Sequence, residues 1–241
     1  MKILISDNLA QKGIDLLSSV PEFEVEFKPG LSPEDLRSTI SDAEALIIRS
    51  GTKVTSELIA AAGRLRVIGR AGIGLDNVDI PAASKRGIVV MNTPDGNVIT
   101  TAEHTIAMLM ALSRNIHQAT TSMKTGKWEK KRFLGQEVFH KTLGIIGIGR
   151  IGRIVAERAL GLRMHVIVYD PHMEPETIQK LGVVPVDLDQ LFKSSDYITV
   201  HTPLTRETKG LLNREAFAKM KDGVMIINCA RGGIVNEQDL Y

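Results

Sequence analysis

The fold of this 241-residue chain is decided by the stretch Leu143-Gly144-Ile145-Ile146-Gly147-Ile148-Gly149-Arg150-Ile151-Gly152. Its first four residues form a short apolar run, which is typical of a buried parallel strand. Glycines follow at positions 147, 149 and 152, and residues 154–160 have the apolar spacing of a helix. A second strand pattern, 165–169, ends at Asp170, eighteen positions after Gly152. This order of strand, glycine turn, helix, strand and acidic residue predicts a unit that binds a dinucleotide.

Each glycine of residues 147–152, called the glycine turn below, has its own role in that interpretation. Gly147 allows a tight turn, Gly149 lets the backbone approach a pyrophosphate, and Gly152 lets helix and strand pack closely. The helix N-terminus that follows offers N–H groups and a positive dipole end to the phosphates. Asp170 can accept hydrogen bonds from ribose hydroxyls and repel a 2′-phosphate, which favours NAD over NADP. The complete unit favours this cofactor site over the alternative, a glycine turn without a ligand.

Strand and helix patterns alternate through the rest of the chain. The other predicted strands are residues 2–6, 23–27, 45–48, 67–68, 88–91, 197–200 and 224–228. Ser32, followed by Pro33, is the predicted N-cap of one helix, and Asn236 is the predicted N-cap of the last. Regular alternation of this kind predicts parallel sheets covered by helices. We therefore expect an α/β protein with two Rossmann-like or flavodoxin-like parallel-sheet domains, the second truncated at its C-terminus.

A cluster of turn formers, Asn92–Asn97, predicts the boundary between the two domains. The first domain is expected over residues 1–97 and the second over 98–241, beginning with a linker helix over 98–118. Thr100 and Glu103 have the spacing of a capping box at the start of this helix. The helix has little polar surface, so we expect it to lie buried between the domains, with His104 as a core residue.

The charge balance and the cysteine content limit the classes of partner and the compartment that we expect for this protein. The chain has 30 basic and 28 acidic residues, a formal net charge of +2, so nothing favours a nucleic-acid or membrane surface. Cys229 is the only cysteine, which excludes an intrachain disulfide and fits a reducing compartment, so we expect a cytoplasmic protein. Met1 leads directly into the first strand, so no signal peptide is expected. No metal site is predicted.

A second glycine-rich stretch, residues 69–74, lies in the first half. No long helix follows it, so it is not interpreted as a second dinucleotide site. Arg49 and Arg70 each end a predicted strand nearby, where ligands of such sheets gather. The stretch is either a plain turn or an anion site whose backbone N–H groups face the ligand.

Several motifs together resemble the D-isomer-specific 2-hydroxyacid dehydrogenases, over the whole chain. These motifs are 48–50 with 53–55, 69–79, 91–94, 126–128, 143–152, 169–171, 201–205 and 228–235. The resemblance implies that the first domain binds substrate and the second binds NAD. It also implies an enzyme that oxidises D-3-phosphoglycerate to 3-phosphohydroxypyruvate with NAD, the first step of serine biosynthesis.

The resemblance assigns residues to these sites. Arg231 is implied as the catalytic residue, because a guanidinium fork suits a substrate carboxylate and the C2 oxygen. The implied cofactor contacts are Gly147, Gly149, Arg150, Ile151, Gly152, Asp170, Thr202, Cys229, Ala230 and Arg231. The implied substrate contacts are Arg49, Arg70 and the backbone of Ile73 and Gly74.

Other functions stay open at this point. One alternative is another D-2-hydroxyacid dehydrogenase, acting on hydroxypyruvate, glyoxylate or D-lactate. The other is an NAD-sensing corepressor-like binding protein. The basic segment Lys127–Arg132 is either a dimer contact, as the resemblance implies for a homodimer or homotetramer, or a solvated charged surface.

The resemblance also implies a general acid–base histidine and an orienting glutamate, both placed after residues 228–235. Neither precedes Tyr241, and none of the six histidines occupies the catalytic position; His201 is interpreted as positional. We therefore expect a chain that retains most of the NAD site without turnover at an enzyme's rate. A turnover assay of the 241-residue chain tests this expectation, and rates like those of an intact dehydrogenase would overturn it.

Overall fold

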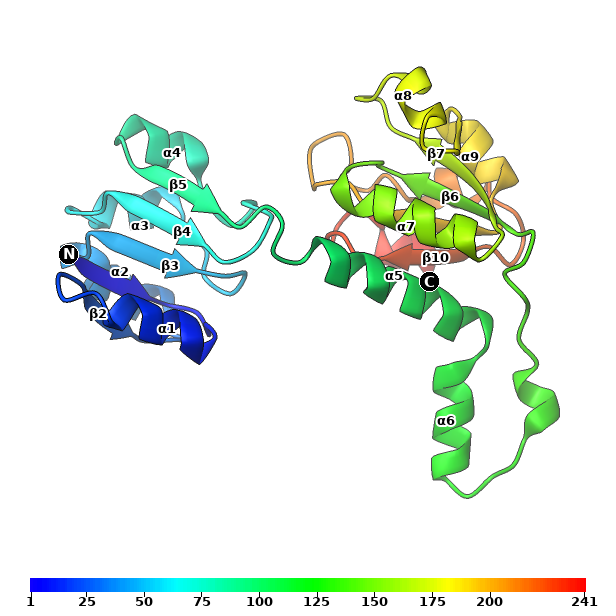
Figure 1. Ribbon diagram of the computed structural model, residues 1–241, viewed down its shortest axis with the longest axis horizontal. Helices are drawn as coiled ribbons and strands as arrows, with labels where there is room; N and C mark the ends of the chain where they lie inside the picture. The colour runs from blue at the N-terminus through cyan, green and yellow to red at the C-terminus, as the bar shows by residue number, and fades with distance from the viewer. The chain divides into compact units, whose positions relative to one another are not determined.

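The computed structural model describes all 241 residues, Met1–Tyr241, as two compact units, Met1–Asn97 and Val98–Tyr241 (Figure 1). Each unit contains one five-stranded sheet in which every pair of neighbouring strands is parallel. Both sheets have helices on their two faces, so the predicted α/β class with two parallel-sheet domains is confirmed.

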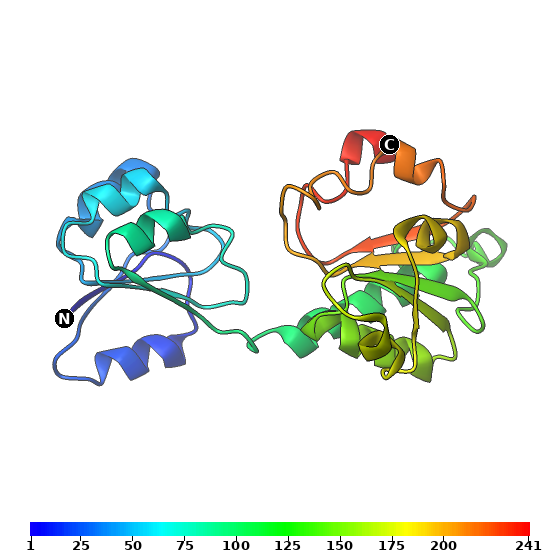
Figure 2. The same cartoon turned by 90° about the horizontal axis from the view of Figure 1, so that it is seen from above.

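In the first unit the strand order is β2-β1-β3-β4-β5. The strands are β1 (Lys2–Ile5), β2 (Glu24–Phe27), β3 (Ala45–Ile48), β4 (Val67–Arg70) and β5 (Val89–Asn92). Helix α1 (Gln11–Ser18) covers one face, and the helices α2 (Pro33–Thr39), α3 (Ser56–Ala61) and α4 (Ile80–Lys85) cover the other (Figure 2). A 3-10 turn, η1 (Ile40–Asp42), leads into β3.

Alternating side chains fill both cores of this unit. On β1, Ile3 and Ile5 pack with Ile14 of α1, whereas Leu4 packs with Leu36 of α2. All three strand residues are buried, as expected for a strand covered on both faces. Helix α2 begins as predicted, because Ser32 accepts a hydrogen bond from the Asp35 backbone N–H at 3.1 Å.

In the second unit the strand order is β10-β9-β6-β7-β8. The strands are β6 (Thr142–Ile146), β7 (His165–Tyr169), β8 (Val184–Pro185), β9 (Tyr197–Val200) and β10 (Met225–Asn228). One core joins the sheet to α5 (Val98–Ser113), α7 (Arg150–Gly161) and α8 (Pro175–Gln179). The other joins it to α9 (Leu188–Ser194) and α10 (Arg214–Phe217). The chain order of the strands reverses between β6 and β9, so this pair marks the topological switch point where ligands of such sheets bind.

A helical arm extends from this sheet (Figure 1). It consists of α6 (Ile116–Lys124) and the 3-10 turn η2 (Lys130–Phe133), and we call residues 116–134 the arm. Asn115 separates α5 from α6 with a left-handed φ of 52°, a conformation that asparagine adopts more readily than most residues. The predicted single linker helix over 98–118 is therefore wrong in extent, since α5 ends at Ser113.

Two further expectations for α5 are also wrong. The helix begins at Val98, so Thr100 lies inside the first turn and cannot be its N-cap. His104 is exposed, while Ala102, Thr105 and Leu109 form the buried face of the helix against α7. At the other end of the chain, Asn236 caps α11 (Glu237–Leu240) as predicted, accepting hydrogen bonds from two backbone N–H groups. None of the helices combines the length and apolar character that a membrane span needs.

Candidate functional site

The glycine turn lies directly after β6, at the switch point beside β9. Gly147 has a φ of +94°, and a Cβ there would lie 2.8 Å from Cγ2 of Thr202 and 2.9 Å from the His201 carbonyl oxygen. A Cβ at Gly152 would overlap the carbonyl oxygen of Gly147. Both positions therefore need glycine, for backbone conformation and close approach respectively. A Cβ at Gly149 would meet nothing within 4 Å, which leaves open space where a pyrophosphate is expected.

Helix α7 has no side-chain cap at its start. Its N-cap is Gly149, which makes no side-chain hydrogen bond to the first turn. By contrast, a side-chain oxygen caps each of α2, α3, α4, α9, α10 and α11. The first turn of a helix has backbone N–H groups without intrahelical partners, and it carries a positive dipole end. The N-terminus of this 12-residue helix, which begins with Arg150 and Ile151, thus suits the phosphates of a dinucleotide.

Asp170 directly follows β7, beside the same turn. Its Oδ2 accepts a hydrogen bond from the Ile148 backbone N–H at 2.9 Å, and its Oδ1 accepts one from the His172 backbone N–H at 2.9 Å. These bonds fix the carboxylate next to the glycine turn. Each carboxylate oxygen has a second lone pair, so Asp170 can still accept hydrogen bonds from ribose hydroxyls.

A cavity of about 270 Å³ lies next to Asp170, with a mostly apolar lining. It is formed by Val168, Tyr169, Asp170, Met173, Pro175, Ile178, Pro185, Val186 and Asp187. An apolar slot beside the carboxylate that is predicted to bind the ribose suits a flat adenine ring. The sequence motif identified β7 and Asp170 but none of the other lining residues, because the slot forms only when β7, α8 and β8 come together.

On the other side of the turn, the residues after β9 contain unpaired polar atoms. Oγ1 of Thr202 and Nδ1 of His201 are buried without a hydrogen-bond partner. Buried polar groups usually have partners, so these two atoms are the ones expected to bind a ligand group. Nε2 of His201 lies 3.1 Å from Oγ1 of Thr199, which orients the ring. These atoms and the open space at Gly149 together fit a dinucleotide at this site.

Burial lowers the pKa of His201 from its ordinary value of 6.5 to about 4. The imidazole is therefore neutral near pH 7, and its pKa lies far from the value that suits an acid–base catalyst at that pH. Between pH 6.5 and 4 the unfolded chain binds a proton at this position and the folded chain does not. The free energy of unfolding therefore decreases as the pH falls through this window.

We expect this effect to reach about 2–3 kcal/mol near pH 4. His201→Gln should flatten the pH dependence of stability between pH 6.5 and 4, measured by urea unfolding at a series of pH values. The control is His117→Gln, on the exposed surface of α6, which should leave the slope unchanged. If the stability of the wild type and of His201→Gln depended equally on pH in this window, the attribution of the effect to His201 would be wrong.

Arg231 lies after β10, in a loop closed by one side chain. Asn228 Oδ1 accepts a hydrogen bond from the Ala230 backbone N–H at 3.0 Å, and Asn228 Nδ2 donates one to the Arg231 carbonyl oxygen at 2.9 Å. Nη1 of Arg231 donates to the Ala230 carbonyl oxygen at 2.8 Å. Asn228, Cys229, Ala230 and Arg231 line a cavity of about 530 Å³. The sequence identified Arg231 and its neighbours but missed the role of Asn228 in shaping the loop.

In the first unit, a network of side chains holds the two predicted arginines. Nε of Arg70 donates to Oδ1 of Asn77 at 3.2 Å, and Nδ2 of Asn77 donates to the Arg49 carbonyl oxygen at 2.7 Å. The Arg49 backbone N–H donates to Oδ2 of Asp7 at 2.6 Å. Asn77 thus connects the loop after β3 with the loop after β4, so the structure brings Arg49 and Arg70 to the same edge of the sheet.

The loop that contains Ile73 and Gly74 is tied down in a similar way. Nδ2 of Asn92 donates to the Ile73 carbonyl oxygen at 2.7 Å, and the Thr93 N–H donates to the Gly72 carbonyl oxygen at 3.1 Å. The Arg70 guanidinium packs over Gly72, where a side chain would overlap it. Asp7, Asn77 and Asn92 were not predicted, since their roles depend on contacts between distant parts of the sequence.

The family model and the curated relatives that match this chain all point to the same family. Residues 106–241 match the family described as D-isomer specific 2-hydroxyacid dehydrogenase, NAD binding domain. The D-3-phosphoglycerate dehydrogenase of Archaeoglobus fulgidus is 51% identical over 241 residues, which are 100% of this chain and 46% of the relative. The enzyme of that name from Homo sapiens is 51% identical over 236 residues, 98% of this chain and 44% of the relative. The chain spans about half the length of the curated relatives it matches.

Solved structures agree with this similarity. A protein from Thermus thermophilus aligns with a TM-score of 0.92 and 35% identity, covering 100% of this chain and 77% of that one. The D-lactate dehydrogenase of Aquifex aeolicus, solved with NAD and lactic acid, aligns with a TM-score of 0.89 and 31% identity. That alignment covers 99% of this chain and 72% of the D-lactate dehydrogenase.

Proposed function

Since the chain belongs to the D-isomer-specific 2-hydroxyacid dehydrogenases, we propose that the protein oxidises D-3-phosphoglycerate to 3-phosphohydroxypyruvate with NAD, the first step of serine biosynthesis. The observation that carries this proposal is the glycine turn, with Asp170 bonded to its backbone at Ile148, inside the region that matches the NAD-binding domain. The identity of about 50% to several D-3-phosphoglycerate dehydrogenases supports the substrate. We place this activity in the cytoplasm, where the lone Cys229 would stay reduced.

The residues of this chain have separate tasks in that reaction. NAD, when bound, accepts the hydride that leaves C2 of the hydroxy acid. Negative charge develops on the C2 oxygen as its proton passes to the general acid–base histidine that the resemblance implies after residues 228–235. The guanidinium of Arg231 would stabilise that charge. We assign the substrate carboxylate to the backbone N–H groups of Ile73 and Gly74, and the phosphate to Arg49 and Arg70.

A substitution at Arg49 tests whether the substrate carries a phosphate. In the full-length protein, Arg49→Gln should raise the KM for D-3-phosphoglycerate about tenfold to a hundredfold, the loss expected for charge-assisted hydrogen bonds to a phosphate. The KM for D-lactate, which has no phosphate, should change much less. Arg64→Gln is the matched control, since Arg64 is exposed and pairs with Glu44 at 3.5 Å.

Equal losses on both substrates would favour the second candidate, a D-lactate dehydrogenase or another enzyme for unphosphorylated 2-hydroxy acids. The similarity to D-lactate dehydrogenases of solved structure supports that candidate. Steady-state kinetics with both substrates therefore separates the two functions.

We further propose that the protein forms a homodimer or homotetramer through α5 and the arm. These segments expose large apolar side chains together: Met108, Ile116, Met123, Trp128 and Leu134. Trp128 is 77% exposed and is surrounded in sequence by Lys127, Lys130, Lys131 and Arg132. Apolar patches of this kind, rimmed by polar residues, are typical of surfaces that bind another protein.

The double variant Ile116→Glu with Met123→Glu should shift the protein to monomers, because each carboxylate would have to be buried in the interface. Sedimentation velocity measures the change. Leu16→Glu, on α1 in the first unit, is the control, since Leu16 is 70% exposed outside this surface. A monomeric wild type, or an unchanged assembly in the double variant, would contradict this interface.

A further inference from the structure

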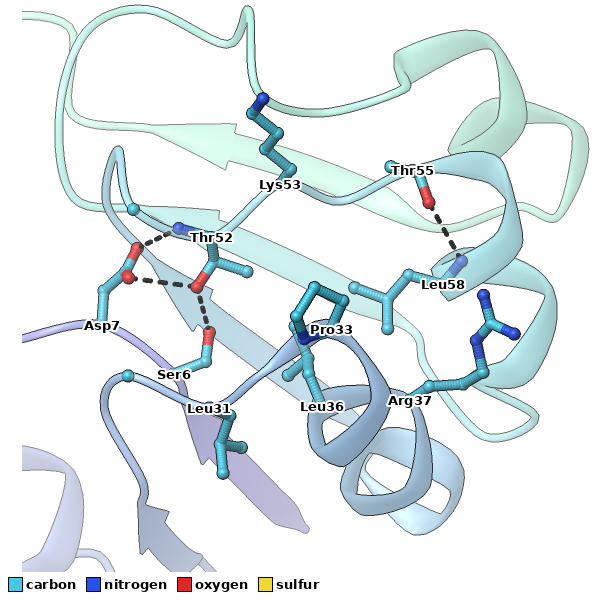
Figure 3. A pocket seen from close by; sticks show the side chains of 12 residues that line it. Ser6, Asp7, Leu31, Pro33, Leu36, Arg37, Thr52, Lys53, Thr55 and Leu58 are labelled. Carbon is cyan, nitrogen blue, oxygen red and sulfur yellow. Dashed lines mark hydrogen bonds between the residues drawn. The ribbon is translucent and has the colours of Figure 1, made fainter.

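A cavity of about 420 Å³ lies in the first unit, at the carboxyl ends of β1 and β3 (Figure 3). In the order β2-β1-β3-β4-β5, the chain proceeds in opposite directions from β1 and β3. This pair is therefore the switch point of the first sheet, the place where open α/β sheets bind their ligands. The volume falls within the range of small-molecule sites. Nothing in the proposed reaction uses this cavity, since Arg49, Arg70, Ile73 and Gly74 do not line it.

One wall of the cavity is apolar. Leu31 lies just before α2, Pro33 and Leu36 lie in α2, and Leu58 comes from α3 (Figure 3). Leu36 and Leu58 are at most 6% exposed, so their positions are fixed by the core of this unit. A fixed apolar wall gives a ligand a place to bury a hydrocarbon group.

The opposite wall is polar, and its groups are already paired. Oγ1 of Thr52 lies 2.9 Å from Oγ of Ser6 and donates to Oδ1 of Asp7 at 3.0 Å. Oδ2 of Asp7 accepts hydrogen bonds from the backbone N–H groups of Thr52 and Arg49. The carboxylate of Asp7 is therefore hydrogen-bonded to the loop after β3, and the N–H and O–H dipoles there offset part of its repulsion of a second anion.

The two remaining charged residues at the cavity are cations, Lys53 and Arg37. Both are exposed, and neither makes a salt bridge or a hydrogen bond in the structure. The pKa of the exposed Glu57 carboxyl is lowered, mainly by a hydrogen bond from Thr55 and to a smaller extent by the charge of Arg37. Glu57 does not line the cavity. An anion at the rim would therefore meet two cations, neither of which is held in a salt bridge by a carboxylate of this unit.

We propose that this cavity binds a small organic carboxylate with an apolar body, at a site separate from the substrate loops. The apolar body lies against Leu36 and Leu58, and the carboxylate lies at the rim near Lys53 and Arg37. Asp7 connects the two sites, because it bonds both Thr52 in the cavity wall and the backbone of Arg49. Occupancy should therefore also perturb the Arg49 amide.

The probe for this site is 4-phenylbutyrate, with the neutral 4-phenylbutanol as its matched compound. In methyl and amide NMR spectra of the whole chain, 4-phenylbutyrate should shift Leu36, Leu58 and the Arg49 amide in a saturable way, with a Kd of about 1 mM or lower. The alcohol should bind at least about tenfold more weakly, and added salt should reduce the difference.

The double variant Lys53→Gln with Arg37→Gln should weaken 4-phenylbutyrate about tenfold and leave 4-phenylbutanol unchanged. Lys12→Gln, on α1 away from the cavity, is the control and should bind as the wild type does. NADH binding, which belongs to the second unit, should be the same in all variants, and unchanged binding of 4-phenylbutanol at Leu36 and Leu58 reports that the first unit is folded. Equal affinity for the acid and the alcohol, no loss in the double variant, or no saturable shifts at Leu36 and Leu58 would each overturn the proposal.

Discussion

Replacing Arg231 by lysine in the full-length protein should lower kcat about a hundredfold to a thousandfold, the loss typical of removing one donor that stabilises charge developing on oxygen. Lysine keeps the positive charge but replaces a planar fork with a single flexible ammonium group, which cannot contact a carboxylate and the C2 oxygen in the same fixed geometry. The loop itself should persist, because Asn228 closes it through the backbone of Ala230 and Arg231.

Arg214→Lys is the matched control for this change. Arg214 begins α10, its side chain is 85% exposed, and its Nε lies 3.7 Å from Oδ1 of Asp239. Its replacement should alter kcat less than twofold or so, as expected for an exposed ion pair. An Arg231→Lys enzyme that retains most of its kcat, with an unchanged melting temperature, would show that the guanidinium is not part of the catalytic step.

Replacing Gly152 by alanine should reduce the affinity for NADH by about a hundredfold or prevent the second unit from folding. The added Cβ would overlap the carbonyl oxygen of Gly147, a backbone atom that cannot move without the whole glycine turn. Overpacking of this kind costs about 1–3 kcal/mol even where neighbouring side chains can adjust. The strain is relieved only if α7 moves away from the turn, which also moves its N-terminus away from the phosphates.

Gly161→Ala is the control, at the last residue of the same helix, where a Cβ meets no atom within 4 Å. Alanine there should raise stability by about 0.5–1 kcal/mol, because glycine is a poor helix former, and should leave NADH binding unchanged. Circular dichroism and NADH fluorescence measure the two effects. Wild-type affinity for NADH in a folded Gly152→Ala variant would contradict the prediction that a side chain at this position disturbs the glycine turn.

Local patterns explain which parts of the fold the sequence could predict. The strand, glycine turn, helix and Asp170 were found because each depends on neighbouring residues and on a fixed spacing. The caps at Ser32 and Asn236 were predicted for the same reason. The turn formers before Asn97 lie where the first compact unit ends.

Features that depend on long-range contacts were missed. Strand β8 has two residues, one of them Pro185, and forms only because Val168 of β7 pairs beside it. The interruption of the helix at Asn115 and the start of α5 at Val98, before Thr100, were also missed. The bonds of Asp7, Asn77 and Asn228 to neighbouring loops likewise had no signal in the sequence.

Paired titrations with NADH and NADPH test most directly whether a dinucleotide binds at the glycine turn with its ribose at Asp170. Nucleotide fluorescence gives the affinities, and the amide resonances of Gly149, Ile151 and Asp170 locate the ligand. We expect saturable NADH binding, at least about tenfold tighter than NADPH because Asp170 repels the 2′-phosphate, with the largest shifts at residues 147–152. No saturation at about 1 mM NADH, or equal affinity for both nucleotides, would contradict that interpretation.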